Sequence, residues 1–266
     1  MRFLGSEAGT AHQAWYRSFA KDYSSLYDAH RDETAAAFLD RLFRRTGRIH
    51  NVLDVACGTF SINLGLIERG YHVVGRDLSE AMIRVARRNV RSQVATADVA
   101  RGDMRALDLP QRFDAILCLG TAFNYLVTPS DVNRALGTFH RHLRPGGLLV
   151  LDLANFDAWI DDNPINARSE GDYRAPDGTR IAVFAFNEQR RRKTVHIARF
   201  LTLVQRGNRI DIRFDEAPMR VWRKDEVARR LRLAGFRPVE WRGDLRARSE
   251  YVRRKSPRLV SVTVRT

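Results

Sequence analysis

Residues that could bind a small ligand stand where a buried strand is expected to end. Asp54 lies within the apolar run 52–55, Gly58 follows in a turn of small residues, and a helical pattern covers residues 61–69. Strand, glycine-bearing turn and helix is the arrangement by which α/β proteins bring backbone N–H groups to a ligand. The Asp54 carboxylate would repel a pyrophosphate, so this turn suits a ligand that carries a cation, such as the ammonium of an amino acid.

A second acid, Asp77, ends the next predicted strand, which covers residues 71–77. It stands 19 residues beyond Gly58, a spacing at which an acid can accept hydrogen bonds from both ribose hydroxyls. Ser79 follows as the expected N-cap of a helix over residues 80–89. The two acids together predict a ligand with a cationic end and a nucleoside end.

The stretch 52–60 resembles motif I of the class I S-adenosylmethionine-dependent methyltransferases, written (D/E)-x-G-x-G-x-G. It is most similar to the glycine and sarcosine N-methyltransferases and to the amino-sugar N-methyltransferases. The chain keeps Asp54 and Gly58, but Ala56 stands at the first glycine and Phe60 at the third. A left-handed backbone would cost a non-glycine residue about 1–2 kcal/mol. We therefore expect right-handed φ at Phe60, with its ring near the methionine end of the cofactor or near a lid.

Further motifs follow in the order that this family has them. Residues 102–105, Gly-Asp-Met-Arg, match the segment in which an acid and a bulky side chain hold the adenine. The predicted strand 113–120 matches the one whose end lies under the sulfonium. Residues 144–147, Arg-Pro-Gly-Gly, lead into the apolar strand 148–153. With the acid that ends the second strand, the matches cover residues 52–153.

The resemblance implies S-adenosylmethionine as the cofactor, S-adenosylhomocysteine as the product, and no metal. Arg31 matches the position of an arginine that pairs with the methionine carboxylate. The expected substrate-side residues are Asn124, Tyr125, Asn155 and Tyr173. The expected cofactor-binding residues are Tyr23, Arg31, Asp54, Ala56, Cys57, Gly58, Asp77, Leu78, Met82, Asp103, Met104, Leu119 and Gly120.

Methyl transfer requires no covalent nucleophile from the protein, because it is an in-line displacement that depends on alignment of the acceptor with the methyl group. An ammonium acceptor must first lose a proton, either to solvent or to a nearby base. The sequence leaves the base open, with Tyr27, Tyr125 and His196 as candidates. His140 and His142 lie on a predicted helix over residues 131–143, and we expect them to be structural.

The expected fold is α/β: a Rossmann-like, seven-stranded, mostly parallel sheet with helices on both faces. We expect an N-terminal helical cover over residues 1–50 and a cofactor-binding core over 51–153 and 223–266. Residues 154–222 are expected to form an antiparallel β insertion after the fifth strand, serving as a lid, a substrate-binding element or a contact in a homo-oligomer. Its first part reads as loop, and its three predicted strands cover residues 180–186, 194–205 and 209–221.

The net charge of +15 does not by itself indicate nucleic acid. The basic residues are 42 Arg and 4 Lys scattered along the chain, which is more typical of the codon usage of a GC-rich genome than of a phosphate-binding patch. No apolar run approaches the roughly 20 residues of a membrane span. The N-terminus lacks the apolar core of a signal peptide, so we expect a cytoplasmic protein with no membrane contact. Cys57 and Cys118 are expected to be free thiols.

The sequence therefore predicts a methyltransferase that acts on a small molecule, with the amine nitrogen of a sugar or natural-product intermediate as the favoured acceptor. An RNA methyltransferase is the first alternative, supported by the charge alone. The motif (D/N)-P-P-(Y/F/W) of enzymes that methylate the exocyclic amines of bases is absent, since Leu119-Gly120-Thr121-Ala122 stands in its place. A non-catalytic protein that binds S-adenosylmethionine is the second alternative, motivated by Phe60.

Glycine and sarcosine are not expected as acceptors. The methyltransferases for these amino acids follow the fifth strand with Arg-Asn-Tyr-Asp, whose arginine pairs with the substrate carboxylate. Here the matching stretch is Ala154-Asn155-Phe156-Asp157. A buried carboxylate without a partner costs several kcal/mol. Activity on these amino acids would require a replacement arginine, such as Arg168 or Arg174.

Overall fold

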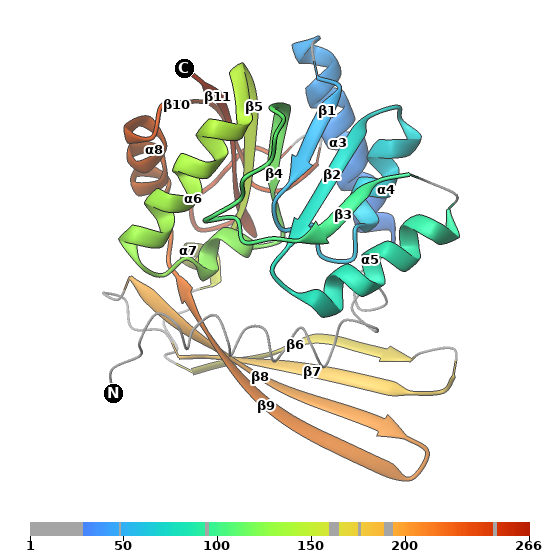
Figure 1. Ribbon diagram of the computed structural model, residues 1–266. Helices are drawn as coiled ribbons and strands as arrows, with labels where there is room; N and C mark the ends of the chain where they lie inside the picture. Colours follow the sequence, from blue (N-terminus) through green and yellow to red (C-terminus); the bar gives the residue numbers. More distant parts are fainter. Residues whose placement is uncertain are drawn as a thin grey trace.

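The computed structural model describes residues 29–47, 49–93, 96–159, 165–174, 177–188, 194–246 and 249–266. A seven-stranded sheet forms its centre, in the order β10-β11-β5-β4-β1-β2-β3 (Figure 1). Only β11 runs antiparallel to its neighbours in this sheet, so the predicted α/β architecture is confirmed. The strands are β1 (Asn51–Asp54), β2 (His72–Asp77), β3 (Asp98–Arg101), β4 (Phe113–Cys118), β5 (Leu143–Ala154), β10 (Phe236–Arg242) and β11 (Arg258–Arg265).

Helices cover both faces of this sheet because successive strand residues point to opposite sides. Val52 of β1 packs with α3, α4 and α5, whereas Leu53 packs with α6 and α8. Each fully buried aliphatic or aromatic side chain stabilises the fold by roughly 1.5–3 kcal/mol relative to exposure. The helices are α3 (Ala29–Thr46), α4 (Ser61–Glu68), α5 (Glu80–Ser92), α6 (Pro129–His142) and α8 (Lys224–Leu233), with a 3-10 turn η1 (Ala122–Tyr125) after β4.

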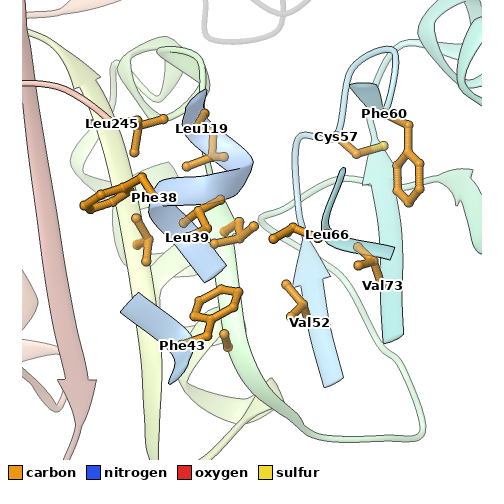
Figure 2. Packing of buried hydrophobic residues seen from close by; sticks show 14 of the residues in the cluster. Phe38, Leu39, Phe43, Val52, Cys57, Phe60, Leu66, Val73, Leu119 and Leu245 are labelled. Atoms are coloured by element: carbon orange, nitrogen blue, oxygen red, sulfur yellow. The ribbon is translucent and has the colours of Figure 1, made fainter. Parts of the chain in front are cut away.

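The helix α3 forms the part of the predicted N-terminal cover that the structure describes. Its apolar stripe is buried: Leu39 and Phe43 lie with Leu66 of α4 and Val52 of β1 in one cluster (Figure 2). Gly47 closes the helix with φ 75° and donates its N–H to the carbonyl of Phe43, as a C-cap glycine does. The preceding part of the cover, with Tyr23 and Tyr27, lies outside the described residues.

A second, four-stranded antiparallel sheet follows the fifth strand, in the order β6-β7-β8-β9. Figure 1 shows this sheet lying across the end of the molecule at which β1 and β2 finish. The predicted antiparallel insertion is present, but the prediction of loop over its first part was wrong. The added elements are α7 (Phe156–Trp159) and β6 (Ile165–Arg174), and the other strands are β7 (Arg180–Glu188), β8 (Val195–Arg206) and β9 (Arg209–Arg220).

The strand β6 escaped prediction because its sequence, INARSEGDYR, has little intrinsic preference for strands. Pairing with β7 over nine residue pairs supplies the missing stabilisation, and the register shifts between Ser169 and Gly171.

A smaller correction concerns the predicted turn over residues 144–147. These residues belong to β5 itself, where the pairing with β4 shifts register between Phe113 and Ala115. In the described part of the chain, no helix has the length and apolar character needed to cross a bilayer.

Candidate cofactor and substrate site

Asp54 closes β1 and is 3% exposed. One carboxylate oxygen accepts the N–H of Ala56 at 3.0 Å, and the other accepts Nδ2 of Asn63 at 2.8 Å. Burial raises the pKa of Asp54 to about 7, the hydrogen bonds from Asn63 and Ala56 lower it in part, and the nearby Asp77 carboxylate raises it further. The acid thus ties the turn after β1 to the first turns of α4 and holds negative charge beneath the turn when it is ionised.

Asp77 joins two turns that the sequence singles out, the turn after β1 that contains Gly58 and the turn after β2 that contains Ser79. Its oxygens accept the N–H of Gly58 at 2.9 Å and the N–H of Ser79 at 2.8 Å. Burial raises the pKa of this carboxyl above its usual value, although both backbone N–H groups lower it in part. Since each carboxylate oxygen can accept more than one hydrogen bond, both oxygens keep capacity for a pair of ligand hydroxyls.

Phe60 differs from the expectation in its backbone, whereas a position of its ring near the methionine end of the cofactor stays a prediction. Its φ is 70° and ψ 11°, which is left-handed, so the prediction of right-handed φ was wrong. Its ring is fully buried in the cluster on the α3–α5 side of the sheet, next to Cys57, and not at a lid (Figure 2). Burial of a whole phenylalanine ring stabilises the fold by roughly 1.5–3 kcal/mol. That gain offsets the cost of about 1–2 kcal/mol for the left-handed backbone.

Asp103, the acid expected beside the adenine, is held by Arg105. The Arg105 guanidinium donates from Nη2 at 2.7 Å and from Nε at 2.9 Å, and its Nη1 bridges to Asp131 of α6 at 3.0 Å. Burial raises the pKa of Asp103, but the hydrogen bonds from Arg105 lower it by more, so the pKa lies below its usual value. Asp103 is therefore an ionised acceptor at neutral pH. The role of Arg105 was not predicted, although its spacing of two residues from the acid signals it.

The turn after β4, expected under the sulfonium, is clamped by two residues that no motif indicated. Gly120 has φ 62° and Thr121 has φ 73°. The N–H of Gly120 donates to the Asp152 carboxylate at 3.0 Å, and the N–H of Thr121 donates to the Asp152 carbonyl at 3.1 Å. Arg258 of β11 binds the same carboxylate from Nε at 2.7 Å and the Thr121 hydroxyl from Nη1 at 2.8 Å.

The two asparagines predicted on the substrate side are fully buried and bind backbone groups. Asn124 accepts the N–H of Ala154 at 3.1 Å and donates to the carbonyl of Arg220 at 2.9 Å, which joins β5 to β9. Asn155 donates to the carbonyls of Arg253 and Ser256 at 2.8 and 2.7 Å. These bonds give both side chains a structural role, and contact with a substrate stays a prediction for each.

Two candidate bases lie where the central sheet meets the second sheet. Tyr125 packs in a cluster that contains Phe156 and Met219, and His196 is 3% exposed with its ring centroid 4.9 Å from that of Phe156.

His142 of α6 has a structural role, as expected. Its Nε2 accepts a hydrogen bond from the N–H of Leu109 at 2.9 Å, and its Nδ1 contacts the Thr138 carbonyl at 2.8 Å.

The remaining predicted residues fall into three groups. Met82 and Leu119 are buried, and burial raises the pKa of the Cys57 thiol well above its usual value, which makes it unreactive. Arg31 and Tyr173 belong to α3 and β6, but their side chains lie outside the description. Ala56, Leu78 and Met104 are half-buried. Within the described ranges, no three His, Cys, Asp or Glu side chains gather closely enough to hold a metal ion.

Comparison with known proteins matches the part of the chain that contains Asp54, Asp77 and Asp103. A family model described as a methyltransferase domain matches residues 52–147. Over 162 residues the chain is 32% identical to a glycine/sarcosine N-methyltransferase from Parasynechococcus marenigrum, which covers 60% of this chain and 57% of that protein. It is 34% identical over 152 residues to a dTDP-4-amino-2,3,4,6-tetradeoxy-D-glucose N,N-dimethyltransferase from Saccharopolyspora spinosa, covering 54% of this chain and 59% of that protein. These matches span little more than half the length of either relative.

The similarity to solved structures extends over nearly the whole chain. An amino pentose methyltransferase from Micromonospora echinaspora, involved in calicheamicin biosynthesis and solved with S-adenosylmethionine bound, has a TM-score of 0.72 at 25% identity. The match covers 94% of this chain and 97% of that one. The likeness therefore includes the second sheet as well as the central one.

Proposed function

Because this chain belongs to the S-adenosylmethionine-dependent methyltransferases, we propose that it transfers a methyl group from that cofactor to the amine nitrogen of a small molecule. The observation that carries the proposal is the position of Asp77. Its carboxylate is fixed by the N–H groups of Gly58 and Ser79, at the end of β2 and beside the turn after β1. A rigid hydrogen-bond acceptor at this place suits the hydroxyl groups of the cofactor's ribose.

The other described acids suit the remaining parts of the cofactor. Asp103, held ionised by Arg105, would accept a hydrogen bond from the exocyclic amine of the adenine. Asp54 lies beneath the turn that would meet the amino acid end, where an ionised carboxylate favours a cation. When bound, the cofactor supplies an electrophilic methyl group on a sulfonium. The chain's own contribution is to hold the acceptor nitrogen in line with that methyl group and to exclude water.

An amino sugar or a related natural-product intermediate is the acceptor that we favour. The relative from Saccharopolyspora spinosa is named for a deoxyamino sugar. Ala154, which stands where the glycine and sarcosine enzymes have their carboxylate-binding arginine, is fully buried in the end of β5. That position offers no guanidinium to an amino acid carboxylate, and a carboxylate buried there without a partner would cost several kcal/mol.

The acceptor amine must reach the methyl group without its proton. Tyr125 and His196 lie at the junction between the two sheets, and the second sheet lies across the end of the molecule at which β1 and β2 finish (Figure 1). Either could take the proton, and deprotonation in solvent before binding is the alternative. Comparing the pH dependence of kcat with that of kcat/KM in Tyr125→Phe and His196→Gln separates these routes.

RNA is a weaker candidate for the acceptor because many arginines are already paired with acids of the same chain. Arg76 pairs with Asp98, Arg220 with Glu226 and Arg258 with Asp152. Such pairs neutralise part of the positive charge that phosphate binding would need.

The function is tested with the purified chain of 266 residues. Calorimetry with S-adenosylhomocysteine measures cofactor-site binding, and transfer of labelled methyl is followed over dTDP-amino sugars, glycine, sarcosine, hydroxyl analogues and RNA. We expect binding of S-adenosylhomocysteine and turnover of at least one amino sugar. Robust turnover of glycine or sarcosine would overturn the acceptor class, and labelled RNA would favour the RNA enzyme. Tight binding without turnover on any acceptor would indicate a non-catalytic binding protein, and failure to bind at all would overturn the assignment of the site.

A further inference from the structure

The antiparallel insertion leaves the core and returns to it at two points that one side chain joins. The strand before the insertion, β5, ends at Ala154, and its last strand, β9, ends at Arg220 (Figure 1). Asn124 of η1 binds both ends: its Oδ1 accepts the N–H of Ala154 at 3.1 Å, and its Nδ2 donates to the carbonyl of Arg220 at 2.9 Å. This pair of bonds, the Asn124 joint, fastens partners that lie 30 and 96 residues away along the chain.

Burial makes the Asn124 joint specific. The Asn124 side chain is 0% exposed, and a buried backbone group that loses its only partner destabilises the fold. An asparagine amide presents its acceptor on one side and its donor on the other. It can bind the Ala154 N–H and the Arg220 carbonyl together only while the ends of β5 and β9 keep one spacing and one orientation. The joint therefore fixes how the insertion is attached to the core.

The side chain of Arg220 reinforces the same attachment. Its Nη1 donates to the carbonyl of Val127, just after η1, at 3.1 Å, and its Nη2 binds Glu226 of α8 at 2.6 Å. The guanidinium carbon lies 4.7 Å from the ring centroid of Trp222, and that ring stacks on Phe123 of η1 with 5.5 Å between the centroids. Backbone, side-chain and aromatic contacts thus hold the end of β9 against η1.

Asn124 is also one backbone turn away from the segment that is expected to meet the methyl group. Its own N–H donates to the carbonyl of Thr121 at 2.9 Å. Asp152 and Arg258 hold Thr121 in the clamp on the turn after β4. A shift of the Asn124 joint would therefore reach that turn through only three residues.

The two candidate bases lie close to the Asn124 joint. Tyr125 is the next residue of η1, and His196 of β8 pairs with Met219, which precedes Arg220 in β9. Tyr125 and Met219 pack in one cluster with Phe156. The position of the second sheet against η1 therefore determines where these side chains lie relative to the turn after β4.

We propose that Asn124 is a positioning residue for methyl transfer, which holds the second sheet in a fixed place against the turn after β4. This inference rests on the proposed function, because it assigns the acceptor to the region where that turn and the second sheet meet. Asn124 acts through its backbone partners and not by contact with the acceptor. The acids expected to bind the cofactor, Asp54, Asp77 and Asp103, bond to other groups, so the Asn124 joint should govern use of the acceptor and not affinity for the cofactor.

Two substitutions break the Asn124 joint to different extents. Asn124→Leu keeps a side chain of similar size and removes both hydrogen bonds. Asn124→Asp keeps an acceptor for the Ala154 N–H but loses the donor to the Arg220 carbonyl. Thr263→Val is the matched control, because the Thr263 hydroxyl makes a buried bond of the same kind to the carbonyl of Leu149 at 3.1 Å, between β11 and β5. Circular dichroism verifies folding, and if Asn124→Leu does not fold, Asn124→Asp carries the same tests.

Hydrogen exchange followed by mass spectrometry tests the Asn124 joint without any acceptor. Loss of a local contact opens the segments that it holds while the rest of the protein stays folded. We expect Asn124→Leu to speed exchange by about tenfold or more in η1 and at the ends of β5 and β9, with exchange in β1 and β2 unchanged. Asn124→Asp should affect the end of β9 more than the end of β5. Equal acceleration throughout the chain, or the same local acceleration in Thr263→Val, would overturn the proposal.

Kinetics separates a positioning role from a purely structural one. With a dTDP-amino sugar that the native chain methylates, we expect kcat/KM of Asn124→Leu to fall by about tenfold to a hundredfold. The Kd for S-adenosylhomocysteine, measured by calorimetry, should stay unchanged, and Thr263→Val should keep the native kcat/KM. Native kcat/KM in Asn124→Leu would leave the joint a purely structural role and overturn the proposal.

Two further outcomes would overturn the proposal in other ways. A fall in kcat/KM without faster exchange would indicate direct contact between Asn124 and the acceptor. A matching loss of affinity for S-adenosylhomocysteine would place the effect in the cofactor site. If the native chain methylates no amino sugar, the proposed acceptor class fails, and the exchange experiment alone decides whether Asn124 holds the second sheet in place.

Discussion

The ring of Phe60 occupies the space that the missing side chain of Gly75 leaves open on β2. A Cβ atom at Gly75 would lie 2.7 Å from Cε2 of Phe60 and 3.0 Å from the Cys57 sulfur. Phe60 is fully buried and holds a left-handed backbone at the first turn of α4. The departure of this turn from the usual glycine is therefore matched by a glycine on the adjacent strand, which keeps the turn after β1 close to the sheet.

Replacing Gly75 with alanine should destabilise the fold by roughly 1–3 kcal/mol, because the added methyl group overpacks the ring. In a Phe60→Ala background the same replacement should cost much less, since the ring that it strikes is gone, and the two substitutions should be non-additive. Urea unfolding measures both. Gly137→Ala, in α6 with only the end of Arg141 at 3.7 Å, is the control and should be neutral or stabilising. Additive effects would contradict the pairing of Phe60 with Gly75.

Replacing Asp77 with alanine should weaken binding of S-adenosylmethionine while the protein stays folded. Each lost hydrogen bond to a charged group is worth roughly 1.5–3 kcal/mol, which corresponds to a tenfold to several-hundredfold rise in Kd. Calorimetry with S-adenosylmethionine measures the change, and Asp108→Ala, at an exposed acid, serves as the control. Unchanged affinity in Asp77→Ala would remove this acid from the ribose site.

The clamp on the turn after β4 predicts a large effect of Arg258. The Asp152 carboxylate is 6% exposed, so Arg258→Met would leave it buried without its cationic partner, at a cost of about 3–5 kcal/mol. The double variant Arg258→Met, Asp152→Leu should recover much of this stability, because no buried charge remains. It should not recover kcat, since the Gly120 N–H loses its acceptor and Thr121 its hydroxyl partner. Full recovery of kcat with stability would show that the clamp has no part in positioning the turn.

Asp54 should make stability depend on pH in the direction opposite to an ordinary ion-paired acid. Burial raises its pKa from 3.8 to about 7, so between these values the folded state binds more protons than the unfolded state. Its contribution to stability is therefore complete below about pH 4 and declines as pH rises to 7, by about 4 kcal/mol in all. Subtracting the unfolding free energies of Asp54→Asn from those of the native chain at each pH isolates this slope. A flat difference between pH 4 and 7 would contradict the raised pKa.

The local patterns of the sequence were sufficient to determine the strand–turn–helix–strand framework that holds Asp54 and Asp77. Apolar runs of strand length, the small turn at Gly58 and the spacing to Asp77 lie within one strand–helix–strand unit, whose contacts are close in sequence. The same is true of the cap at Gly47, whose N–H binds the carbonyl of Phe43 in the same helix. In each case the partner is within one element or its neighbour, so residue type and period carry the information.

Only the tertiary structure decided the features that depend on distant partners. Phe60 adopts a left-handed backbone because β2 offers a glycine beside its ring, and β6 forms because β7 pairs with it despite its weak strand preference. Arg258 reaches Asp152 across 106 residues of chain. The amides of Asn124 and Asn155 bind backbone groups of distant segments. The free energy of these contacts comes from packing and hydrogen bonds between elements brought together by folding, and no short-range pattern in the sequence records which elements those are.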